Sequence, residues 1–170
     1  LVSSTSSAPP ICVTTDEPGW TTIIPYGDST MNLPWKDNVT NSSCSGYTGN
    51  STPGFLNGSY SKTKLFSAPA GRCTFKVNAV IDDYLDLFID NQLKWDSPMG
   101  GWCMHCNNAS KPPFEKEFSM DFTSAGTHTV KLTGTDAGVV AYMDVEMKMQ
   151  CLPFSSSSSS SSISYVASSA

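Results

Sequence analysis

The strict alternation of side-chain character between residues 139 and 151 is the feature that most constrains the fold. Every second residue in this stretch is apolar, and almost all of the residues between them are polar. The apolar positions are Val139, Ala141, Met143, Val145, Met147, Met149 and Cys151. Successive side chains of a β-strand point to opposite faces, so this period of two predicts a half-buried strand.

The same alternation recurs in other parts of the chain, and turn-forming residues lie between the repeats. Alternating stretches occupy residues 73–81, 83–90, 114–122 and 127–133. Between them lie Ala70-Gly71, Asp90-Asn91 and Ser124-Ala-Gly126, which favour tight turns. No stretch combines an apolar period of 3.6 with helix caps. We therefore predict an all-β protein: an antiparallel, jelly-roll-like β-sandwich stabilised by disulfides.

The domain organisation follows from changes in composition. We expect a Ser-rich N-terminal arm at 1–10, a sandwich domain at 11–153 and a Ser-rich C-terminal tail at 154–170. The chain of 170 residues is long enough for one hydrophobic core. Residues 20–65 are the least regular part, and we expect one or two strands near Thr21–Ile24 with long loops.

Three segments in this order resemble PA14-like and galactose-binding-like β-sandwich domains. They are Phe66–Val77, the Asp82–Asn91 stretch with its paired aspartates, and the Ser124–Gly138 stretch with its Ala-Gly-Thr-His run. The resemblance covers about residues 65–150 and implies the fold more than the function. Many members of these families bind glycans, often with calcium, and many others hold assemblies together. The resemblance therefore implies one of these two roles. The chain departs from the pattern by inserting Cys103-Met-His-Cys106 and by lacking a full sugar-binding signature.

The cysteine content indicates an oxidising compartment. An even number of cysteines suits a disulfide framework, and the six are Cys12, Cys44, Cys73, Cys103, Cys106 and Cys151. The Cys103–Cys106 motif lacks the following helix that a redox pair needs. Zinc would need two more ligands, which other cysteines or His128 would supply. Disulfides are the favoured interpretation; we expect Cys12 to pair with Cys151 and regard a small Cys103–Cys106 loop as an alternative.

Glycosylation signals support an extracellular or cell-surface location. Five N-x-Ser/Thr sequons occur, at Asn38, Asn41, Asn50, Asn57 and Asn108. Eight consecutive serines are candidates for O-glycosylation: Ser155, Ser156, Ser157, Ser158, Ser159, Ser160, Ser161 and Ser162. We expect residue 1, which is not Met, to be the mature end left after a signal peptide is removed.

The charge pattern excludes one large class of partners. Charged residues make up 15% of the chain, the formal net charge is −5, and Arg72 is the single arginine. Such a chain cannot lay down the basic stripe that neutralises nucleic-acid phosphates. Its apolar runs are short and interrupted, so we expect no membrane span.

Candidate metal and catalytic residues are few. Asp82 and Asp83, together with Asp86 and Asp90, are candidates for calcium ligands, but a solvated strand edge and a turn are the favoured interpretation. We therefore expect no cofactor, with calcium as the alternative. The chain has no Gly-x-Ser-x-Gly elbow and only two histidines, so we do not expect an enzyme.

Two functional hypotheses remain. In the first, the chain is a structural subunit of a secreted, glycosylated filament or surface appendage that binds copies of itself through its sandwich and terminal arms. Strand-forming residues Ile163, Tyr165 and Val166 would add to the sheet edge of a neighbour. In the alternative, it is a carbohydrate-binding or adhesion domain on an O-glycosylated stalk. Aromatic side chains that stack on sugars or plug the core are Trp20, Tyr26, Trp35, Tyr47, Trp95 and Trp102.

Overall fold

The computed structural model is a β-sandwich, and it describes residues 16–37, 59–100, 114–135 and 140–154. Within these ranges the regular structure consists of strands, and none forms a helix. The nine strands are β1 (Thr21–Ile24), β2 (Leu33–Asp37), β3 (Ser59–Ala68), β4 (Gly71–Asp82), β5 (Tyr84–Ile89), β6 (Gln92–Asp96), β7 (Phe114–Phe122), β8 (Gly126–Thr135) and β9 (Val140–Leu152). The all-β class predicted from the alternation is confirmed.

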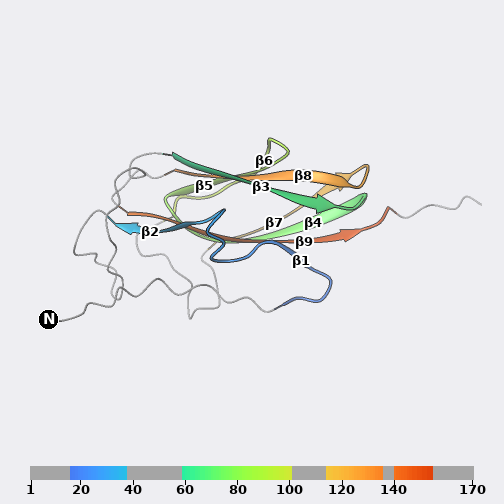
Figure 1. Ribbon diagram of the computed structural model, residues 1–170, viewed down its shortest axis with the longest axis horizontal. Helices are drawn as coiled ribbons and strands as arrows, with labels where there is room; N and C mark the ends of the chain where they lie inside the picture. Colours follow the sequence, from blue (N-terminus) through green and yellow to red (C-terminus); the bar gives the residue numbers. More distant parts are fainter. Residues whose placement is uncertain (1–15, 38–58, 101–113, 136–139, 155–170) are drawn as a thin grey trace, which may run out of the picture.

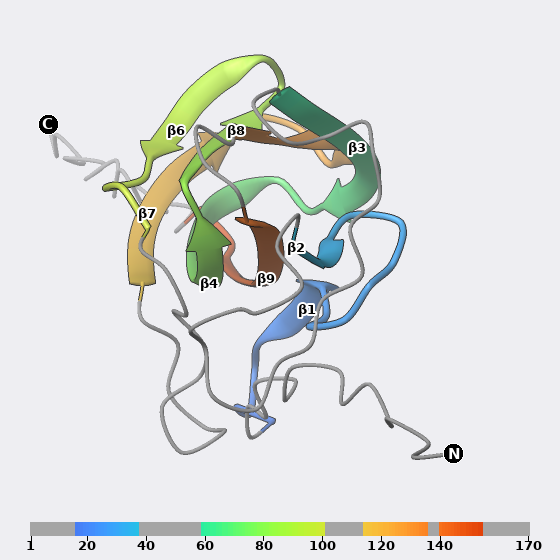
Figure 2. The ribbon, with the colours of Figure 1, turned by 90° about the vertical axis from the view of Figure 1, so that its left-hand side faces the viewer.

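The strands form two antiparallel sheets stacked face to face, as Figures 1 and 2 show. The first sheet has the order β1-β9-β4-β7, with β2 also pairing with β9. The second has the order β3-β8-β5-β6. Each sheet buries the face that it turns toward the other, which is the usual way for two half-apolar sheets to satisfy both surfaces.

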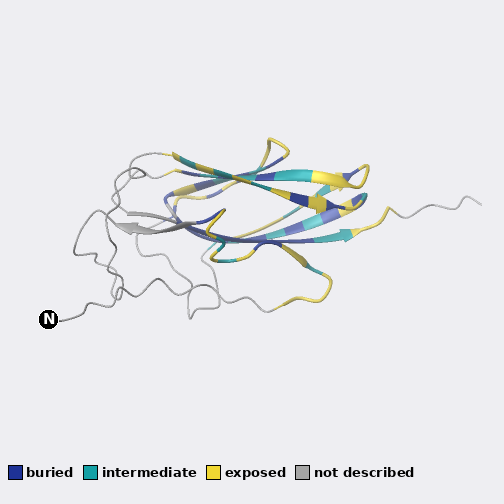
Figure 3. Ribbon diagram, in the orientation of Figure 1, coloured by how far each residue is buried: buried dark blue, intermediate teal, exposed yellow. Residues whose placement is uncertain are grey.

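The core lies between the sheets and is closed by aromatic contacts (Figure 3). Phe75 of β4 is fully buried and contacts Phe66 of the facing sheet, edge to face, at a ring-centroid distance of 6.1 Å. It also stacks on Phe118 of β7 at 5.2 Å. Such aromatic pairs contribute about 0.5–1.5 kcal/mol beyond the area that they bury. The facing sheet supplies Leu85, Leu87, Ile89, Val130 and Leu132, all of them fully buried.

The predicted strands match most of the observed ones. Residues 21–24, 73–81, 83–90, 114–122, 127–133 and 139–151 all lie on strands, with shifts of a few residues at their ends. The Asp90-Asn91 turn is confirmed as well: both residues have positive φ, 48° and 63°, and join β5 to β6. Strand β3, however, lies in the segment for which we expected mainly loops.

The prediction that residues 139–151 form a half-buried strand is wrong in one respect. Strand β9 is central in its sheet, with β4 on one side and β1 and β2 on the other. Its polar side chains Asp144, Glu146 and Lys148 are about as buried as its apolar ones, each at 4–5% exposure. Part of this cover comes from the segment between β1 and β2, where the Gly27 N–H donates to Oδ1 of Asp144 at 2.8 Å. The alternation alone does not reveal such cover.

The expected Cys12–Cys151 pair is also wrong, because Cys151 is bonded to Cys73. These two residues lie directly opposite each other on β9 and β4, with 4.0 Å between their Cα atoms. Strand register thus brings together cysteines that are 78 positions apart in the sequence. The other four cysteines lie outside the described residues.

The segment between β1 and β2 fastens to β9 through Asn32. The buried Asn32 side chain donates to the carbonyl of Val145 at 3.3 Å and accepts from the Val145 N–H at 3.0 Å. It thereby imitates a strand partner where β1 has ended and β2 has not yet begun. The adjacent Met31 is fully buried in the core.

Several predicted sites lie outside the described residues. These are the five sequons, the serines at 155–162, and the expected subunit contacts Ile163, Tyr165 and Val166. In the described ranges there is no helix of the length and apolar character that a membrane crossing would need.

Candidate ligand-binding face

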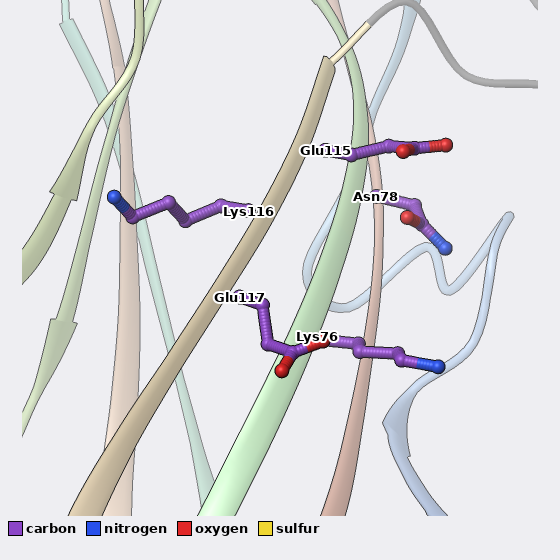
Figure 4. A pocket seen from close by; sticks show the side chains of 5 residues that line it. All are labelled: Lys76, Asn78, Glu115, Lys116 and Glu117. Atoms are coloured by element: carbon purple, nitrogen blue, oxygen red, sulfur yellow. The ribbon is translucent and has the colours of Figure 1, made fainter.

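A hollow of about 170 Å³ lies on the first sheet where β4 and β7 run side by side. Its lining consists of Lys76 and Asn78 from β4 and of Glu115, Lys116 and Glu117 from β7. Figure 4 shows Lys76, Asn78 and Glu115 extending to one side of the sheet, whereas Lys116 extends to the other. We call the outward-facing group, Lys76, Asn78, Glu115 and Glu117, the polar hollow.

Strand register creates this grouping. Lys76 pairs with Glu117, and Asn78 pairs with Glu115, in the antiparallel ladder of β4 and β7. The intervening residue Val77 points into the core and is fully buried. Directly opposite residues on one face lie about 4.5–5.5 Å apart at their Cβ atoms, so the four polar side chains form a compact square.

Lys76 is held in place by two neighbours from the turn before β1. Its Nζ lies 2.7 Å from Oε2 of Glu17 and 4.4 Å from the centre of the Trp20 ring. The hydrogen bond from Lys76, with a smaller charge–charge contribution, lowers the pKa of the Glu17 carboxyl despite an opposing desolvation effect. The ammonium is therefore already paired, and the half-buried indole of Trp20 borders the polar hollow.

Asn78 connects the polar hollow to a buried ion pair. Its side-chain amide donates to Oε2 of Glu146 at 3.1 Å, and Oε1 of Glu146 lies 3.4 Å from Nζ of Lys148. The Glu146 and Lys148 side chains are only 5% and 6% exposed. Removal of either member of this pair would leave an uncompensated buried charge next to Asn78.

The groups still available to a ligand are mainly acceptors. Within the described ranges, the exposed carboxylates of Glu115 and Glu117 have no hydrogen-bond or ion-pair partner. The side-chain nitrogen of Asn78 donates to Glu146, and its oxygen, which has no donor among the described residues, is a further acceptor. Such a face suits a ligand that is rich in hydroxyl donors.

The structure describes the side chains of three of the four aspartates considered for calcium; that of Asp82 lies outside the described residues. The Asp83 side chain is buried, and its main chain bonds to Thr135 and Gly100. Asp86 faces outward on the second sheet, opposite Asp96; burial, with a further contribution from Asp96, raises its pKa. In the part of the chain that the structure describes, no three His, Cys, Asp or Glu side chains gather closely enough for a metal ion.

Asp90 has a structural partner instead. Its carboxylate accepts the Thr129 N–H at 2.9 Å and lies 2.7 Å from Nδ1 of His128. Desolvation raises its pKa, but these two hydrogen bonds outweigh that effect and lower it overall. The other ring nitrogen of His128 is buried against Phe122 without a partner among the described residues, so it offers no access to a substrate.

The aromatic candidates divide between the two roles considered for them. Trp95 is 7% exposed and belongs to the core. Trp20 lies at the polar hollow, and Tyr26 is half-buried in the segment that leads to β2. Tyr47, Trp102 and the side chain of Trp35 lie outside the described residues. The polar residues of the hollow were not identified from sequence, although the alternation placed Lys76 and Glu117 on outward faces.

No protein-family model and no curated protein matches the sequence. Among solved structures, the fold is similar to a family 35 carbohydrate binding module from an environmental isolate, with a TM-score of 0.38 and 12% identity over 75% of this chain and 96% of the module. It is also similar to a GH31 α-xylosidase from Xanthomonas citri, with a TM-score of 0.33 and 16% identity over 56% of this chain. The match spans 10% of the xylosidase. At such low TM-scores, neither likeness bears on the function of this chain.

Proposed function

We propose that the chain is a carbohydrate-binding module and that its ligand lies in the polar hollow. The single observation that carries the proposal is the arrangement of Lys76, Asn78, Glu115 and Glu117 in one hollow beside Trp20. Binding sites of this kind combine a few fixed polar groups with an aromatic surface. A role in binding rather than catalysis is consistent with the buried position of the His128 ring nitrogen.

The chemistry of the lining favours neutral, hydroxyl-rich saccharides. A sugar hydroxyl donates to carboxylate and amide oxygens, and charge-assisted bonds of this type are stronger than neutral ones. Because Lys76 is already paired with Glu17, little positive charge remains to attract uronic acids or sulfated glycans. The Trp20 ring, which contacts the Lys76 ammonium, adds an aromatic surface next to the hollow.

Binding of a panel of neutral and acidic oligosaccharides, measured by calorimetry, tests the proposal. We expect a neutral member to bind wild-type protein and to lose at least about tenfold in affinity in Glu115→Gln/Glu117→Gln, because about 1.4 kcal/mol of hydrogen bonding corresponds to that factor. Asp121→Asn is the matched control, since Asp121 lies on the same strand and face but outside the hollow. Equal loss in the control, or no binding by wild-type protein, would refute the proposal.

The secreted filament subunit stays a second proposal. The observation that favours it is the Ser-rich composition of both ends of the chain. Residues 1–15 and 155–170 lie outside the described part. Removal of residues 155–170 is expected to abolish polymerisation, and electron micrographs with normal fibres from the truncated protein would exclude the role assigned to the tail.

The extracellular setting and the sugar attachment sites are likewise proposals, supported by the Cys73–Cys151 bond. Mass spectrometry of protein secreted from a eukaryotic host, before and after enzymatic deglycosylation, is expected to show occupied sequons. An unchanged mass would contradict N-glycosylation at all five positions.

A further inference from the structure

The outer edges of both sheets share a property that bears on self-association. Strands β7, β3 and β6, and the pair β1 and β2, each have a strand partner on only one side among the described residues. An unpaired strand edge presents free N–H and C=O groups to any other strand, including that of a second copy. Each of these edges carries a feature that opposes such pairing.

On β7 this feature is Lys116. It occupies an inward-facing position, opposite Val77 and between Phe114 and Phe118, which both pack against the core. Its side chain nevertheless stays exposed and extends away from the polar hollow, as Figure 4 shows. A strand added to this edge would continue the sandwich over the lysine and bury its charge, which is costly without a partner.

On β3 the corresponding residues are Lys62 and Lys64. Both occupy inward-facing positions of the strand, in the same alternating set as the buried Phe66. Nζ of Lys64 reaches Asp28 at 2.8 Å, and Nζ of Lys62 lies 5.4 Å from the centre of the Tyr60 ring. Extension of the sheet past β3 would have to break or cover these contacts.

The remaining edges are short and irregular. Strands β1, β2 and β6 have four, five and five residues. The pairing of β1 and of β2 with β9, and that of β5 with β6, each contains a register shift. Short, bulged edge strands can form few consecutive hydrogen bonds with an added strand.

We infer that this sandwich is built to resist strand addition at every edge that the structure describes, and that Lys116 is the residue that keeps β7 from pairing with a second copy. Strand β7 is the edge whose inward face carries one charge, Lys116, since the other inward residues from Phe114 to Phe122 are apolar and the whole strand pairs with β4 without a register shift. Its excluded partner is a second β7, since two antiparallel copies of one strand form a closed twofold interface. The inference is independent of carbohydrate binding, and it argues against filament assembly by strand addition at the described edges.

The test compares Lys116→Thr with Lys116→Arg by size-exclusion chromatography with light scattering over a range of concentrations. Threonine favours strands and removes the charge, whereas arginine retains it. We expect wild-type protein and Lys116→Arg to remain monomeric and Lys116→Thr to approach about twice the monomer mass as concentration rises. A Lys116→Thr protein that unfolds like wild type and stays monomeric would overturn the inference.

Amide hydrogen exchange of wild-type protein gives a second readout that needs no variant. We expect the β7 amides that do not bond to β4 to exchange at the same rate at all protein concentrations, since no copy covers them. Concentration-dependent protection confined to β7 or β3 would show that the wild-type edges do pair, and would overturn the inference even if Lys116→Thr failed to fold.

Discussion

The disulfide between Cys73 and Cys151 is expected to make a large contribution to stability, mainly by restricting the unfolded chain. The two cysteines are 78 residues apart, and for a loop of that length the chain-entropy relation gives about 4.5 kcal/mol at 25 °C. Replacement of both by alanine is therefore expected to lower the free energy of unfolding by about 3–5 kcal/mol. The native sheet should persist, because β4 and β9 remain joined along eleven residue pairs.

Urea unfolding followed by tryptophan fluorescence measures this effect, since Trp95 is buried in the core. The dependence of the free energy on urea concentration should also become steeper, because an uncrosslinked unfolded chain exposes more surface. Val145→Ala is the control: it removes two methyl groups from a fully buried position on β9 and should cost about 2 kcal/mol with an unchanged slope. A double cysteine variant within about 1 kcal/mol of wild type, with the same slope, would refute the reasoning.

Three further substitutions test other parts of the structure. Asp90→Asn keeps a residue that tolerates the left-handed turn but removes the carboxylate that contacts His128. We expect the free energy of unfolding to fall by roughly 1 kcal/mol at pH 7, and by less as acid protonates Asp90 in the wild-type protein. A fall that does not depend on pH in chemical denaturation would contradict this. Asp86→Asn removes a carboxylate whose charge is disfavoured by burial and, to a smaller extent, by Asp96. We expect it to stabilise the protein by about 0.2–1 kcal/mol at pH 7, with the gain vanishing below the raised pKa of Asp86; destabilisation at pH 7 would count against these causes. Gly71→Ala should lower the melting temperature by several degrees, equivalent to at least about 1 kcal/mol. The cause is that φ of Gly71 is 142° and that an added Cβ would overlap the backbone carbonyl of Leu152. An unchanged melting temperature would exclude this contact.

The strands that were predicted from the sequence are those whose inward face is mainly apolar, including β7 with one inward lysine, Lys116. Strand β4 is an example: Phe75, Val77 and Ala79 are fully buried, and polar residues separate them. Strand β3 was not predicted, because its inward-facing residues include Lys62 and Lys64. Charged residues at inward positions of an edge strand oppose pairing with another strand, and they also interrupt the alternation of apolar and polar residues from which a strand is predicted.

The polar hollow could be predicted only in part. Alternation assigns Lys76 and Glu117 to outward faces, but it does not say that β4 pairs with β7 or at which register. The burial of the Glu146–Lys148 pair could not be predicted either, because the alternation assigns both residues to an outward face. Pairings between residues about 40 to 70 positions apart are set by the packing of the whole sandwich rather than by any local pattern.

A titration of isotope-labelled protein with neutral oligosaccharides, followed in amide correlation spectra, tests the proposed ligand-binding face most directly. We expect the chemical-shift changes to concentrate on the amides of residues 76–78 and 115–117 and on the indole N–H of Trp20. We expect Glu115→Gln/Glu117→Gln to abolish these changes. Spectra that do not change with any saccharide, or shifts that gather on the outer face of the β3-β8-β5-β6 sheet, would contradict the proposal.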